Sequence, residues 1–229
     1  SGALRGALRS LLPAQDCLLC DDDAGDALLC ESCRTALPIL GKPCCPSCAM
    51  PTPGGELCGR CLSHRPRFDA TSALWRYAYP VDQLIHALKF SHRLPVANFI
   101  GAAMLAAGTP GPGDLLIPVP LSRQRLRQRG FNQALEVARP LARALGIPLS
   151  FDTCLRVVDT PPQSALPWKE RQRNVRHAFE CRADLTGKHV VVVDDVMTTG
   201  ATLDEFARVL KNHGAATVTN WVCARALKP

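Results

Sequence analysis

Two adjacent carboxylates follow a run of four valines in the C-terminal part of the sequence. The run Val190–Val193 is typical of a strand buried on both faces, and it delivers Asp194 and Asp195 to the carboxyl end of that strand. Carboxylate oxygens accept hydrogen bonds from a sugar diol and also hold the water shell of a metal ion. Neighbours within a strand point to opposite faces, but we expect the backbone to turn at the strand end, so that both acids can approach one ligand.

A short segment of small and hydroxyl-bearing residues comes next. It consists of Thr198, Thr199, Gly200, Ala201 and Thr202. The apolar spacing of residues 201–212 predicts a helix that begins inside this segment. Backbone N–H groups at a helix start, together with hydroxyls, form a cradle for phosphate. Acids that suit a diol beside a phosphate cradle predict a site for a ribose 5-phosphate.

Arginines cluster after a second predicted strand, residues 115–119. The segment Pro118–Arg123 can turn there and present backbone N–H groups, and Leu121, Ser122 and Arg123 are its candidates for a phosphate contact. Four arginines then alternate along the chain: Arg123, Arg125, Arg127 and Arg129. Because the planar guanidinium suits phosphate, we expect this run to bind a polyanion rather than to form a merely solvated face.

A long, polar and basic connection spans residues 160–176. It contains Lys169 and Arg171, two cations that can neutralise a phosphorylated substrate. The length and charge of this connection predict a mobile lid over the site. An ordinary surface loop is the alternative interpretation.

The cysteines follow one spacing twice. The pattern C-x2-C-x9-C-x2-C is formed by Cys17, Cys20, Cys30 and Cys33, and again by Cys45, Cys48, Cys58 and Cys61. Two C-x2-C pairs complete a closed tetrahedral shell of thiolates, which favours two structural zinc ions over a disulfide framework. Pairing in sequence order is the expected arrangement, with interleaved pairing as the alternative. Cys44 is an odd cysteine that either replaces Cys45 or lies beside the site; keeping the repeat favours Cys45.

The elements that position these residues alternate between strands and helices after residue 66. This order predicts an α/β fold with a parallel sheet flanked by helices at residues 66–229, preceded by a small cysteine-rich zinc module at residues 1–65. Of the 229 residues, 47% are hydrophobic, which excludes a wholly disordered chain. The net charge of +7 comes from 27 basic against 20 acidic residues, and 21 of the basic residues are arginines, which points to a polyanionic partner. We expect no membrane span and no secretory leader, and hence a cytoplasmic protein.

The segment Val190–Thr202 resembles the loop that binds phosphoribosyl pyrophosphate (PRPP) in type I phosphoribosyltransferases. The resemblance implies that Asp194 and Asp195 hold the ribose hydroxyls, that Thr198–Thr202 hold the 5-phosphate, and that Mg²⁺ arrives with the pyrophosphate. Residues 118–123 resemble the pyrophosphate loop of the same enzymes. Purine-salvage members carry an acid at the position of Thr198, so purine salvage is disfavoured.

The whole chain from Cys17 to Ala226 resembles the ComF family of bacterial proteins, on its cysteine pairs, the motif Arg129-Gly-Phe-Asn-Gln133 and the PRPP loop. The family is associated with DNA uptake in natural transformation, and with single-stranded DNA and a helicase-like partner. The resemblance implies a PRPP-binding protein, and its first interpretation is a phosphoribosyltransferase with an unnamed acceptor. In such an enzyme, Asp194 and Asp195 fix the ribose. The departing pyrophosphate is stabilised by Arg129, Lys169 and Arg171. The alternative is a non-catalytic, zinc-containing nucleic-acid adaptor with a PRPP-sensing or relic site.

Overall fold

The computed structural model describes residues 15–90, 94–158 and 175–227. The predicted lid residues Lys169 and Arg171 therefore lie outside the described residues. None of the helices within these ranges has the length and apolarity needed to cross a bilayer.

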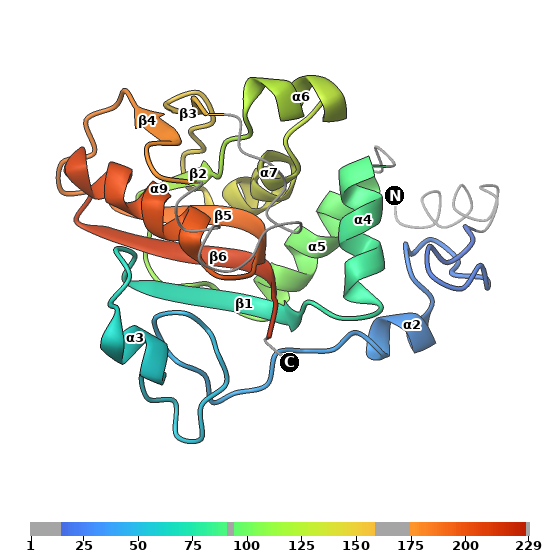
Figure 1. The fold of residues 1–229 in the computed structure, drawn as a ribbon. Helices are drawn as coiled ribbons and strands as arrows, with labels where there is room; N and C mark the ends of the chain where they lie inside the picture. The colour runs from blue at the N-terminus through green and yellow to red at the C-terminus, as the bar shows by residue number, and fades with distance from the viewer. Residues whose placement is uncertain (1–14, 91–93, 159–174, 228–229) are drawn as a thin grey trace.

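A four-stranded sheet forms the centre of the fold (Figure 1). Its order is β1 (Ala70–Arg76), β6 (Thr217–Arg225), β5 (His189–Met197) and β2 (Leu115–Pro118), and every neighbouring pair is parallel. Parallel neighbours require crossover connections, and helices supply them here. The structure confirms the predicted α/β class with a parallel sheet.

Helices cover both faces of this sheet, and the valine run explains why. Val191 and Val193 belong to one core, with α4 (Val81–Phe90), α5 (Leu94–Ala106) and α7 (Gln133–Leu145). Val190 and Val192 belong to a second core on the opposite face, with α9 (Ala201–Asn212). Because strand side chains alternate, a strand buried on both faces needs apolar residues at consecutive positions.

A small second layer stands beside the carboxyl ends of β5 and β2. It contains α6 (Arg123–Arg129) and an antiparallel pair of short strands, β3 (Cys154–Arg156) and β4 (Phe179–Cys181). Ser122, at the start of α6, forms a bridge with Arg156 of β3, which ties this layer to the end of β2. The layer thereby supplies one wall of the space above the sheet.

The cysteine-rich segment runs along the β1 edge of the sheet, from α2 (Glu31–Thr35) to α3 (Gly59–Ser63) (Figure 1). Between the two helices, the Leu40 N–H donates to the Leu74 carbonyl at 2.8 Å, and the Arg76 N–H donates to the Pro38 carbonyl at 2.8 Å. These bonds cover the exposed edge of β1, which would otherwise offer unpaired backbone groups. The domain boundary at residue 65 stays a prediction.

Candidate functional site

The strand that carries the two acids is longer than predicted. Strand β5 continues past Val193 to Met197, because β6 pairs with it as far as Met197 opposite Arg225. The expected turn directly after Val193 is therefore wrong. Strand β2 ends earlier, at Pro118 opposite Val193, so the edge of β5 beyond Val193 is left open on that side. The site lies beside the part of β5 that extends beyond the end of β2.

Asp195 is buried and forms an ion pair with Lys89, which reaches it from the last turn of α4. Burial by itself raises the pKa of Asp195, but the Lys89 ammonium outweighs burial and lowers that pKa to about 2. Burial likewise lowers the pKa of Lys89, and Asp195 more than compensates, so the pKa of Lys89 is raised. Sequence reasoning missed Lys89, because a lysine in the last turn of an amphipathic helix has no motif around it.

Asp194 has a different electrostatic environment from its neighbour. Its Oδ1 accepts a hydrogen bond from the Asp195 N–H at 2.9 Å. Burial, followed by the negative charge of Asp195, raises the pKa of Asp194 well above its usual range. The pair therefore combines one acid whose negative charge is compensated by Lys89 with one acid whose ionisation the site disfavours.

The five residues that follow β5 have two roles: two of them line the cavity, and the other three form the turn that leads into α9. Thr198 and Thr202 line the cavity. Thr199 is buried, and its Oγ1 accepts the Ala201 N–H at 3.2 Å, while Ala201 is buried in the first turn of α9. Gly200 has φ +80°, and a Cβ there would lie 2.6 Å from Cε of Met197, so this position favours glycine.

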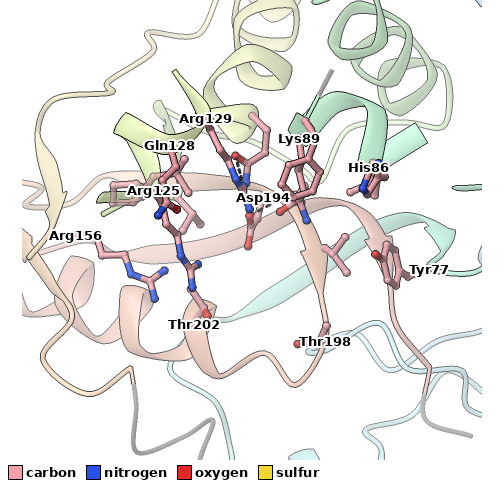
Figure 2. A pocket seen from close by; sticks show the side chains of 18 residues that line it. Tyr77, His86, Lys89, Arg125, Gln128, Arg129, Arg156, Asp194, Thr198 and Thr202 are labelled. Carbon is pink, nitrogen blue, oxygen red and sulfur yellow. Dashed lines mark hydrogen bonds and ion pairs between the residues drawn. The ribbon is translucent and has the colours of Figure 1, made fainter. Parts of the chain in front are cut away.

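The arginine run forms a short helix, and only one of its faces meets the cavity. Arg125 and Arg129, four residues apart, lie on the same side of α6 and line the cavity, whereas Arg123 and Arg127 are exposed and do not. Figure 2 shows the Arg125 side chain extending from α6 towards Thr202. The Arg129 Nη1 donates to Gln133 Oε1 at 3.0 Å, and its guanidinium lies 5.4 Å from the centre of the Phe90 ring.

Arg156 is a third guanidinium in this wall, and sequence reasoning missed it. It comes from β3, is buried, and lies 5.4 Å from the centre of the Phe179 ring. Figure 2 places Arg156 on the same side of Asp194 as Arg125, with Lys89, His86 and Tyr77 on the other side. The sequence around Arg156 carries no phosphate-binding signal; in the structure, the pairing of β3 with β4 and the bridge between Ser122 and Arg156 bring it to the site.

The predicted pyrophosphate segment is partly at the cavity. Leu121 lines the cavity together with Pro120. Ser122 is buried, and its side chain accepts the Arg125 N–H at the start of α6, so it serves as a helix cap. Of the three candidates Leu121, Ser122 and Arg123, only the first therefore lines the cavity; Ser122 is buried and Arg123 is exposed.

The cavity has a volume of about 570 Å³, within the usual range for small-molecule sites. The cavity is lined by four positively charged side chains, those of Lys89, Arg125, Arg129 and Arg156. Only Asp194 and Asp195 oppose them among the lining residues. The surplus of positive charge suits an anionic ligand, and the acids and hydroxyls suit a sugar.

The cysteines form the two predicted four-thiolate groups. The sulfur atoms of Cys17, Cys20, Cys30 and Cys33 lie within 4.8 Å of one another, and so do those of Cys45, Cys48, Cys58 and Cys61. The groups follow the sequential pairing, and the second group contains Cys45 rather than Cys44. That these individual cysteines are metal ligands stays a prediction. Cys44 instead donates from Sγ to the Gly41 carbonyl at 2.9 Å. Four thiolates fit a structural zinc ion and leave no open coordination position for a substrate.

Comparison with known proteins agrees with both halves of this description. Residues 132–227 match the family model of the phosphoribosyl transferase domain, and residues 7–62 match that of the double zinc ribbon domain. The chain is 37% identical over 207 residues to the DNA utilization protein YhgH of Shigella flexneri, covering 87% of this chain and 91% of the relative.

Two further relatives carry competence names. Competence protein F of Haemophilus influenzae is 31% identical over 214 residues, covering 86% of this chain and 90% of the relative. Competence protein ComFC of Bacillus subtilis is 28% identical over 238 residues, covering 92% and 95%. With two zinc ribbons joined to a phosphoribosyltransferase-like sheet, and with these relatives along most of its length, the chain belongs to the ComF family.

Proposed function

We propose that this protein binds PRPP with Mg²⁺ in the cavity at the carboxyl ends of β5 and β2. The observation that carries the proposal is the convergence of an acid pair, two threonine hydroxyls and three guanidinium groups on one cavity. Asp194 and Asp195 hold the ribose hydroxyls, and Thr198–Thr202 at the start of α9 hold the 5-phosphate. Arg125 and Arg129 face the pyrophosphate, which brings Mg²⁺ with it.

The same arrangement suits phosphoribosyl transfer to an acceptor. An attack on C1 of the ribose releases pyrophosphate, and the negative charge that develops on it is stabilised by cations held in place beforehand. Arg129 is held by Gln133 and by the Phe90 ring, so it needs little rearrangement. Lys169 and Arg171 remain predicted contributors to this step.

We further propose that this protein acts on DNA or close to it, since its relatives are named for DNA utilization and for competence. Arg123 and Arg127, on the exposed face of α6, are available to a phosphate backbone outside the cavity. They also support the second candidate function, a nucleic-acid adaptor that uses the cavity only to sense PRPP. Single-stranded DNA and a helicase-like protein stay the predicted partners.

Titration calorimetry with Mg²⁺ and PRPP tests the proposed ligand. We expect binding to the wild-type protein and a loss of affinity of at least about tenfold in Asp194→Asn, because a carboxylate bond to the ligand is worth about 1.5–3 kcal/mol. Equal affinity in the two proteins, or no binding to either, would overturn the proposal. Release of pyrophosphate in the presence of single-stranded DNA would identify a transferase that uses DNA as its acceptor, whereas the adaptor releases none.

A further inference from the structure

A single buried arginine connects the second zinc ribbon to the loop proposed to hold the 5-phosphate. Arg225, the last residue of β6, is only 2% exposed. Its Nε donates to the carbonyl oxygen of Cys48 at 2.8 Å. Its Nη1 lies 2.9 Å from the carbonyl oxygen of Met197 and also bonds the carbonyl of Thr198. One buried side chain thus forms hydrogen bonds both to Cys48, in the second four-cysteine group, and to the residues where the loop begins.

Three other contacts join the second ribbon and the chain that follows it to the same region. The Thr71 N–H of β1 donates to the Pro46 carbonyl, between two zinc ligands, at 3.1 Å. The Arg67 N–H donates to Asp204 Oδ1, in the first turn of α9, at 2.6 Å. Phe68 packs in one core with Met197 and lies 3.8 Å from the position of a Cβ at Gly200. The start of α9 and the turn before it therefore pack against the segment that directly follows the second ribbon.

The two ribbons differ in which core they join. Cys45, Cys48 and Cys61 belong to the core that contains Met197 and α9. Cys17 belongs to the opposite core, with the residues of α4, α5 and α7. This difference gives a natural internal control, because both sites have the same four ligands and the same spacing.

Electrostatics favours the same connection. A buried guanidinium needs nearby negative charge, and the four acceptor groups that hold Arg225 are neutral carbonyls. Four thiolates around one Zn²⁺ carry two net negative charges, and Cys48 belongs to such a group. A zinc-loaded second ribbon therefore stabilises the charge of Arg225 at the place where its hydrogen bonds hold the loop.

We infer that Arg225 is a positioning residue through which the second zinc ribbon, and not the first, holds residues 197–202 in the conformation that receives a phosphate. The identity of the ligand rests on the function proposed above, but the conformation of the loop does not. The loop can be followed without ligand by hydrogen exchange of the amides of residues 196–203, with the amides of α7 as the reference.

The first test is Arg225→Lys, which keeps the charge but replaces the fork by one ammonium that cannot bond the carbonyls of Cys48, Met197 and Thr198 together. We expect exchange at residues 196–203 to become at least about tenfold faster, with α7 unchanged and two zinc ions retained. Unchanged exchange in the loop would overturn the inference.

The second test compares the two zinc sites. Cys58→Ser with Cys61→Ser is set against Cys30→Ser with Cys33→Ser, and each pair is expected to reduce the zinc content by one ion per chain. Only the first pair is expected to speed exchange in the loop and to weaken binding of Mg²⁺ with PRPP by about tenfold or more. Equal effects of the two pairs on the loop would overturn the inference.

Two outcomes distinguish this inference from the proposed function. If the wild-type protein shows a protected loop but binds no PRPP, the proposed function fails, and the exchange pattern of Arg225→Lys alone decides the positioning role. If the Cys58 and Cys61 variant loses protection in α7 as well, it has unfolded globally, and the Arg225→Lys result is again decisive.

Discussion

Lys89 and Asp195 form an ion pair that joins α4 to the strand carrying the acid pair. The side chain of Asp195 is 8% exposed and that of Lys89 is 20% exposed, so the pair is largely removed from water. Removing one partner of a buried pair leaves a charge without compensation, which is much more costly than removing both. The pair therefore contributes to folding as well as to the charge of the site.

Lys89→Met tests this contribution. We expect it to lower the free energy of unfolding by about 3 kcal/mol, since Asp195 is left buried without its cation. Urea denaturation provides the measurement. The control is Lys89→Met combined with Asp195→Asn, which removes both charges and should recover most of the loss; a double variant as unstable as the single one would contradict the pairing.

The raised pKa of Asp194 predicts a specific dependence of stability on pH. The folded protein keeps a proton on Asp194 at pH values where the unfolded chain, with a pKa of about 3.9, has released it. The free energy of unfolding should therefore fall as the pH rises above about 4, until the raised pKa is passed. Asp195, with a lowered pKa, acts in the opposite direction, and its contribution is lost only as the pH falls towards 2.

Asp194→Asn isolates this effect, because the amide cannot ionise. We expect the variant to gain stability relative to the wild-type protein as the pH rises from 4 to 8 in urea denaturation. Parallel curves for the two proteins over this range would show that Asp194 is already ionised at pH 4.

The two faces of α6 predict a contrast between neighbouring arginines. Arg125→Ala should weaken binding of Mg²⁺ with PRPP by about tenfold to a hundredfold, because it removes a charged hydrogen-bond donor from the cavity. Arg127→Ala, on the same helix but outside the cavity, is the matched control and should leave that affinity unchanged. Calorimetry of both variants gives the comparison, and equal losses would place the ligand elsewhere.

Zinc content distinguishes the two adjacent cysteines. Cys45→Ser should reduce the zinc content from two ions to one per chain, since its sulfur belongs to the second four-thiolate group. Cys44→Ser should keep both ions, because the Cys44 thiol bonds the Gly41 carbonyl instead. Elemental analysis of the purified proteins checks both, and the reverse result would exchange the two assignments.

Local patterns were sufficient for the elements and for the zinc groups. Apolar periodicity predicted α9 at residues 201–212, because a helix places its apolar residues on one face. The cysteine spacing predicted both four-thiolate groups, because the four cysteines of each group lie close together in the sequence. The acid pair and the threonine loop were identified for the same reason, since they form one continuous segment.

Tertiary structure decided what these segments meet. Lys89 and Arg156 reach the site from α4 and β3, far from the loop in sequence, and the bond from Arg225 to Cys48 joins residues 177 positions apart. The alternation of arginines in α6 could not show which two face the cavity, since that depends on how the helix packs. Local spacing constrains a chain over a few residues, whereas the partners of a buried charge are set only when distant elements pack and water is excluded.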